Sequence, residues 1–219
     1  TFVKYKVYNI LGVIYFNFSE YINALNNFFK ALEFLKENEN EYQNEIAGLY
    51  LNIANICYRN EDYANAIEAL DDSYQIMIQI DYQFGLYLCF NTYGNIYIEL
   101  EEIEQAEFYY KKCLKLAKEL NNSKNLATTY NNLAQVYERK NELKKALEFV
   151  SNSLKINEQL KREAIIAIDY RRIGIISFEL NDTDKGIEFL EKAYKLSSKL
   201  EDKTEALLSL EKLADYCAK

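Results

Sequence analysis

Carboxamide side chains recur at regular spacing in the middle of the sequence. Asn91 and Asn95 are four residues apart, as are Asn131 and Gln135, so each pair would share one face of a helix. A carboxamide carries both a donor and an acceptor, so it can pair with the N–H and C=O of an extended peptide. Because Asn inside a helix costs about 0.5 kcal/mol relative to Ala, this row of amides, together with Asn55, predicts a binding role.

A purely structural origin for these amides is also open. The chain is rich in Asn, Lys, Ile and Tyr, which is typical of an AT-rich genome, and some Asn would then be compositional. Amides on neighbouring helices can also bond to one another. The sequence leaves both interpretations standing.

The residues needed for most catalytic chemistry are missing. The 219 residues contain no His, which excludes Ser-His-Asp and Cys-His sites and removes the commonest general base and metal ligand. Acidic pairs such as Glu101 and Glu102 are expected near turns, without the burial that acid–base work requires. We therefore expect no catalytic residues, no metal and no cofactor, and a chain that is not an enzyme.

Net charge and cysteine spacing indicate which classes of partner and which cellular compartment are expected. The net charge is −8 and the pI is about 4.9, which argues against nucleic acid as a partner of this segment. No apolar run approaches the ~18 residues that cross a bilayer, so no membrane partner is expected. The four cysteines lack any CxxC spacing and are predicted to be reduced core thiols in a cytoplasmic protein.

Small residues mark an internal repeat along the whole chain. They stand at positions 12, 54, 94, 134, 174 and 214, with spacings of 42, 40, 40, 40 and 40. The third copy reads Phe90-x2-Tyr93-Gly94-x2-Tyr97 and is followed by Ala106, Tyr110 and Cys113. We expect each small residue to lie where two helices of one repeat cross, because only Gly, Ala or Ser lets the backbones approach closely. Such units are stable only when stacked on their neighbours.

This pattern resembles the tetratricopeptide repeat signature over essentially the whole chain. The resemblance implies an all-α, right-handed α-solenoid of antiparallel helix pairs, with about 11 helices in five full repeats plus the first helix of a sixth. We expect a single superhelical domain over residues 1–219, with repeats at roughly 5–40, 41–80, 81–121, 122–161 and 162–201 and a half-repeat at 202–219. The common junction Pro is absent and the period is 40 residues, so a long-helix variant is expected. Ser19, Asn141 and Asn181 are predicted as helix N-caps.

In such arrays the first helix of each repeat lines a concave groove. The frame set by the small residues predicts these peptide-binding positions: Asn55, Tyr58, Arg59, Asn91, Asn95, Asn131, Gln135, Arg139 and Arg171. The paired basic residues that hold acidic chaperone tails in related arrays are missing here. The groove instead mixes both signs of charge, which favours a ligand that also carries both.

The leading functional hypothesis is a scaffold that holds an extended peptide or a partner helix in the groove. It predicts that Asn91→Ala and Asn131→Ala each weaken binding without lowering the melting temperature. One alternative is the sensory or regulatory portion of a larger bacterial signalling or transcription regulator, since both ends of the chain look like cuts through a longer protein. Another is self-assembly into a homo-oligomer through the C-terminal helix, which carries Cys217.

Overall fold

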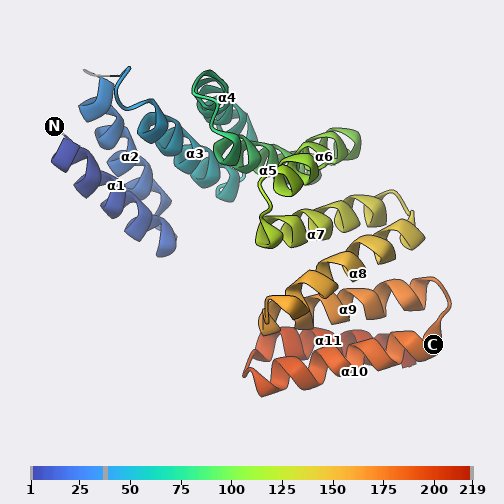
Figure 1. Cartoon of the computed structure of the whole chain (residues 1–219). Helices are drawn as coiled ribbons and strands as arrows, with labels where there is room; N and C mark the ends of the chain where they lie inside the picture. The colour runs from blue at the N-terminus through green and yellow to red at the C-terminus, as the bar shows by residue number, and fades with distance from the viewer. Residues whose placement is uncertain (1, 37–38, 218–219) are drawn as a thin grey trace. The chain divides into compact units, whose positions relative to one another are not determined.

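The chain folds into α-helices joined by short turns (Figure 1). The computed structural model describes residues 2–36 and 39–217, and all of its regular elements are helices. Their bounds are α1 (Phe2–Asn17), α2 (Tyr21–Lys36), α3 (Gln43–Arg59), α4 (Tyr63–Gln79), α5 (Gln83–Glu99), α6 (Ile103–Glu119), α7 (Ser123–Arg139), α8 (Leu143–Gln159), α9 (Glu163–Glu179), α10 (Thr183–Lys199) and α11 (Lys203–Cys217). Within the described residues, the prediction of five helix pairs and one further helix is confirmed.

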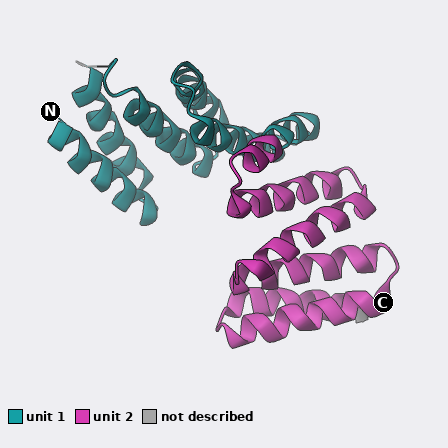
Figure 2. Ribbon diagram, in the orientation of Figure 1, with its two compact units in different colours: residues 1–112 teal, residues 113–219 magenta. Residues whose placement is uncertain are grey.

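The helices form two compact units, residues 1–112 and 113–219 (Figure 2). Helices α1 to α5 belong to unit 1 and α7 to α11 to unit 2, and the boundary falls inside α6. In unit 1, α1 packs on α2 and α3 on α4; in unit 2, α7 packs on α8 and α9 on α10. The single domain expected over residues 1–219, with its repeat boundaries, stays a prediction.

The small residues of the repeat lie at tight helix crossings. A Cβ atom on Gly94 would collide with the ring of Tyr110, and one on Gly12 would collide with the ring of Phe28. The second small position of the repeat is also fully buried, as at Ala66. The expected close approach of the paired helices is therefore present at both signature positions.

The predicted core thiols divide into three cases. Cys89 and Cys113 are fully buried. Cys57 is 8% exposed and faces a cavity of unit 1 that is considered below. The side chain of Cys217, at the end of α11, lies outside the described residues.

Nine of the connections are three residues long, and the middle residue of each has a positive φ. Ser19, Asn141 and Asn181 are among these residues, with φ of 60°, 58° and 63°. Their prediction as N-caps is wrong, because they close the preceding helix in the left-handed conformation. The N-cap of α10 is Asp182, the next residue in the chain, and its side chain accepts from the N–H of Lys185.

No described helix is both long and apolar enough to cross a membrane.

Candidate functional site

Three of the residues predicted from the repeat frame meet at one cavity of unit 2. The cavity has a volume of about 510 Å³ and lies between α7 and α9. Gln135 and Arg139 reach it from α7, and Arg171 reaches it from α9. Its apolar lining comes from Ile168 and Ile175 of α9. The cavity therefore combines an apolar surface with amide and guanidinium groups, as expected of a surface that holds a peptide.

Two arginines at this cavity are already paired. Arg172 donates through Nε and Nη2 to the two carboxylate oxygens of Glu138, at 2.7 and 3.1 Å. Arg171 donates through Nε to Glu205 of α11 at 2.6 Å. These pairs tie α9 to both neighbouring first helices and leave little of their charge for a ligand.

The remaining charges at the cavity are Arg139 and Glu179. Both side chains are exposed, and Arg139 has no ion-pair partner among the described residues. Burial raises the pKa of Glu179, the nearby negative charge of Glu138 raises it further, and the positive charge of Lys212 opposes the rise. The cavity thus offers a ligand one positive group and one carboxylate.

Asn131 lies in a different environment from the one expected of a ligand-binding amide. Its side-chain nitrogen donates to Ser153 Oγ at 2.8 Å and to Asp169 Oδ1 at 2.7 Å, which uses both hydrogens. Its Oδ1 atom is buried without a hydrogen-bond partner in the described part of the chain. This arrangement favours the structural interpretation of Asn131, since the amide has no donor left for a peptide.

Asp169 is the centre of this polar network and is fully buried. Asn157 donates to its Oδ2 at 2.7 Å, and Arg162 in turn donates to Asn157 Oδ1 at 3.0 Å. Burial raises the pKa of the Asp169 carboxyl, while the hydrogen bonds and the positive charge of Arg172 oppose that rise. The network couples α7, α8 and α9 beneath the groove.

The amino-acid sequence contains one signal that points to this network. Asp169 occupies the repeat position held by Leu49, Cys89 and Thr129 in the preceding repeats, all of them buried. A carboxylate at a core position needs hydrogen-bonding partners. An alignment of the repeats with one another shows Asp169 as the charged residue at this core position. Its hydrogen-bond partners cannot be read from the sequence, because they depend on the packing of three helices.

The amides predicted in unit 1 also have internal partners. Asn55 of α3 accepts from Thr92 Oγ1 of α5 at 3.4 Å, and Asn95 accepts from the Tyr110 hydroxyl at 2.7 Å. In both residues the side-chain oxygen accepts a hydrogen bond, and the side-chain nitrogen can still donate. Asn91 lies half-buried on α5.

Tyr58 and Arg59 lie at the C-terminal end of α3. Burial and the negative charge of Glu99 raise the pKa of Tyr58, and Arg59 lowers it in part. Glu99 stands at the C-terminal end of α5, so the structure brings two of the predicted groove residues, Tyr58 and Arg59, together with this carboxylate.

Comparison with known protein families decides the class of this chain. Tetratricopeptide repeat models match residues 45–119 and 86–159, and another tetratricopeptide repeat model matches residues 170–200. The chain belongs to the tetratricopeptide repeat family. No curated protein sequence matches this tetratricopeptide repeat chain.

Solved structures show the same fold at low sequence identity. The apo form of RapI is 21% identical, with a TM-score of 0.82, and the match covers 91% of this chain and 72% of RapI. Aspartyl phosphate phosphatase F from Bacillus subtilis is 18% identical, with a TM-score of 0.82, over 92% of this chain and 52% of the phosphatase. The Rap conjugation gene regulator of plasmid pLS20, in complex with the Phr* peptide, is 16% identical, with a TM-score of 0.73, over 90% of this chain and 54% of the regulator. The tetratricopeptide repeat chain thus spans about half the length of two of these three.

Proposed function

We propose that this chain is a binding scaffold that holds an extended peptide in the groove of unit 2. The observation that carries the proposal is the cavity of about 510 Å³ where Gln135, Arg139 and Arg171 meet. The repeat frame predicts all three as groove residues, and they lie on the first helices of two successive repeats.

Each group at the cavity has a distinct role in the proposed complex. Gln135 is half-buried and would pair with the peptide backbone through its amide. Arg139 would bind an acidic side chain or a terminal carboxylate, and Glu179 would bind a basic group. Ile175 supplies apolar contact with the side chains between them. The fitting ligand is a short extended peptide with both signs of charge.

Similar proteins support a peptide as the ligand class. The pLS20 regulator, which shares the fold over 90% of this chain, was solved with the Phr* peptide bound. Aspartyl phosphate phosphatase F shares the fold as well, but we propose binding without catalysis for this chain. Its most buried carboxylate, Asp169, receives hydrogen bonds from Asn131, Asn157 and Ser153 and is engaged in holding helices together.

Selection followed by charge reversal tests this proposal. Random octapeptides displayed on phage are selected on the immobilised chain, and the recovered peptides are synthesised with a fluorescent label for anisotropy measurements. We expect Arg139→Glu to weaken binding about tenfold or more, since it replaces attraction by repulsion. The matched control is Lys155→Glu on α8, an equal change of charge at an exposed position that does not line the cavity. Equal loss in both variants, or no selected peptide, contradicts the proposal.

A second candidate is that the bound peptide controls a further module of a longer protein. It is favoured by the likeness to the pLS20 gene regulator, of which this chain spans 54%. The gene that encodes the chain decides this point: an open reading frame limited to the repeats contradicts it.

A further inference from the structure

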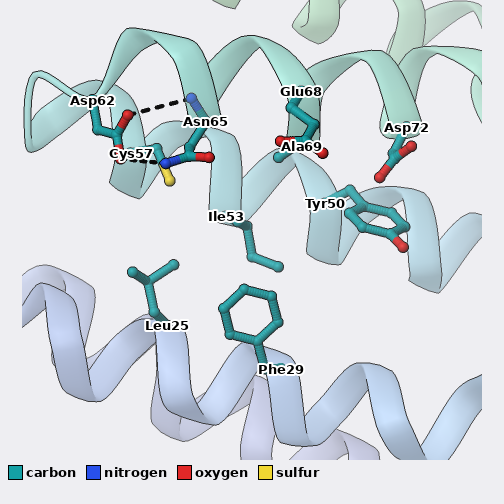
Figure 3. Close-up of a pocket in the computed structure, with 10 residues that line it drawn as sticks. All are labelled: Leu25, Phe29, Tyr50, Ile53, Cys57, Asp62, Asn65, Glu68, Ala69 and Asp72. Atoms are coloured by element: carbon teal, nitrogen blue, oxygen red, sulfur yellow. Dashed lines mark hydrogen bonds between the residues drawn. The ribbon is translucent and has the colours of Figure 1, made fainter.

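Unit 1 has a cavity of its own, where the second helix of the first repeat meets both helices of the second repeat. The cavity has a volume of about 430 Å³ and lies among α2, α3 and α4 (Figure 3). Leu25 and Phe29 reach it from α2, opposite Ile53 and Cys57 of α3 and Ala69 of α4. None of the predicted groove residues lines it. Although Phe29 is a large apolar side chain, it is 50% exposed at this opening.

Comparison between repeats shows why the space is empty. In the next repeat, Tyr97 and Tyr109 stack with ring centroids 5.5 Å apart and planes 5° apart. In the repeat after that, Tyr137 and Phe149 stack in the same way, at 5.2 Å and 4°. The equivalent residues of the second repeat are Cys57 and Ala69. Two small side chains therefore stand where the next two repeats hold a stacked aromatic pair, and the cavity opens at this position.

The wall that α4 contributes is acidic. Glu68 and Asp72 are four residues apart on that helix, both are exposed, and neither has an ion-pair partner among the described residues. Burial, Glu68 and Asp71 raise the pKa of Asp72, as expected of a carboxylate without a nearby cation. Two like charges at this spacing repel one another, so a cation placed between them would relieve the repulsion.

The charge of the whole unit has the same sign. Residues 1–112 contain 7 Lys and Arg against 17 Asp and Glu, whereas residues 113–219 contain 19 against 17. The acidity of the chain thus comes from unit 1 alone. A basic partner would be attracted to this unit and would lose affinity as salt is added.

We propose that this cavity is a docking site for a basic segment of a partner protein, which inserts one aromatic side chain beside Lys or Arg residues. The aromatic ring takes the place of the missing stacked pair, between Phe29 and Ile53. The flanking cations lie against Glu68 and Asp72. This site is separate from the groove of unit 2 and does not depend on a peptide binding there.

A tryptophan peptide provides the test, because the chain contains no Trp and the peptide alone supplies indole fluorescence. The probe is acetyl-Lys-Lys-Trp-Lys-Lys-amide, and the matched probe replaces every Lys by Glu. We expect the basic probe to bind saturably with a blue-shifted emission, and the acidic probe to bind at least about tenfold more weakly. Equal binding of both probes, or no saturable binding of the basic one, overturns the proposal.

A variant in which the cavity is filled by larger side chains tests whether the basic probe binds there. Cys57→Tyr combined with Ala69→Tyr restores the aromatic pair of the next repeat, so we expect binding to fall about tenfold or more while the melting temperature is maintained or rises. Unchanged binding by a folded filled variant overturns the proposal. If the wild-type chain self-associates in light scattering and the filled variant does not, the occupant is a second copy of the chain and the basic partner is rejected.

An exposed charge variant keeps the test independent of core packing. Glu68→Gln combined with Asp72→Asn should weaken the basic probe about tenfold and flatten its salt dependence. The control is Asp81→Asn combined with Glu101→Gln, an equal charge change in two turns of unit 1 away from the cavity. Equal losses in the two double variants would mean that only net charge attracts the probe, which overturns the proposed site.

Discussion

Asn131 was predicted to bind a peptide, but its side chain bonds to neighbouring helices. Its amide donates to Ser153 and Asp169, so truncation would leave a buried carboxylate short of a donor. We therefore expect Asn131→Ala to lower the free energy of unfolding by about 1–3 kcal/mol, contrary to the unchanged melting temperature expected from sequence alone. Urea denaturation measures this change. The control is Gln135→Ala, whose free energy of unfolding should stay within about 0.5 kcal/mol of that of the wild type. Equal losses in the two variants would contradict a structural role for Asn131.

The ionisation of Asp169 predicts a pH dependence with a definite sign. Its pKa is raised above the reference value of 3.8 by burial, so the folded chain holds this proton more tightly than the unfolded chain. The unfolding free energy of the wild type should therefore fall, relative to that of Asp169→Asn, as the pH rises from 3.8 through the folded pKa. Denaturant midpoints across this range measure the difference. If the unfolding free energy of the wild type rises with pH relative to that of Asp169→Asn, the pKa of Asp169 is not raised by folding.

The repeat frame predicts which helix face a residue lies on, but it does not predict the ion-pair partners of that residue. Gln135, Arg139 and Arg171 were assigned to the groove by counting from a small residue, because a helix of constant period places equal offsets on equal faces. The ion pairs of Arg171 with Glu205 and of Arg172 with Glu138 were not foreseen. They join residues 34 apart, and such pairings depend on how neighbouring helices pack.

At the scale of the helices, the three-residue turns share one backbone conformation. In the turn after α3, the N–H of Asp62 bonds to the carbonyl of Cys57 at 2.9 Å, and Glu61 between them has a φ of 60°. This is the arrangement in which helices usually end with Gly, yet no Gly of this chain has a positive φ. Breaks in the apolar pattern predict the turn positions, but the left-handed residue was mistaken for a cap because Asn suits both roles and Ser is a common N-cap.

The left-handed turns predict a simple route to higher stability. Lys161 has a φ of 54°, which is unfavourable for a residue with a Cβ atom. We expect Lys161→Gly to raise the free energy of unfolding by about 1 kcal/mol and Lys161→Val to lower it. The control is Asn141→Gly, where the gain should be smaller because Asn already tolerates this conformation. Thermal unfolding followed by circular dichroism distinguishes them; stabilisation by Val would contradict the explanation.

At the scale of the whole molecule, two units of one repeat family carry different surfaces. Unit 2 is nearly balanced in charge and has a cavity lined by Arg139 and Glu179, while unit 1 is strongly acidic and has a cavity lined by Cys57 and Ala69. The family could be predicted from the amino-acid sequence because small residues recur at a fixed period. The cavity could not be predicted in the same way, because Cys57 and Ala69 fit the repeat pattern and only their combined loss of volume creates the space.

The central claim is that Arg139 contacts an acidic group of a peptide held in the groove of unit 2. The most direct measurement is a charge-reversal rescue with a selected peptide whose acidic residues are changed to Lys one at a time. We predict that one of these peptides binds Arg139→Glu at least about tenfold more tightly than it binds the wild-type chain, and that Lys155→Glu shows no such preference. If every Lys-substituted peptide binds the Arg139→Glu and wild-type chains with the same affinity, the peptide does not contact Arg139 and the proposed groove is contradicted.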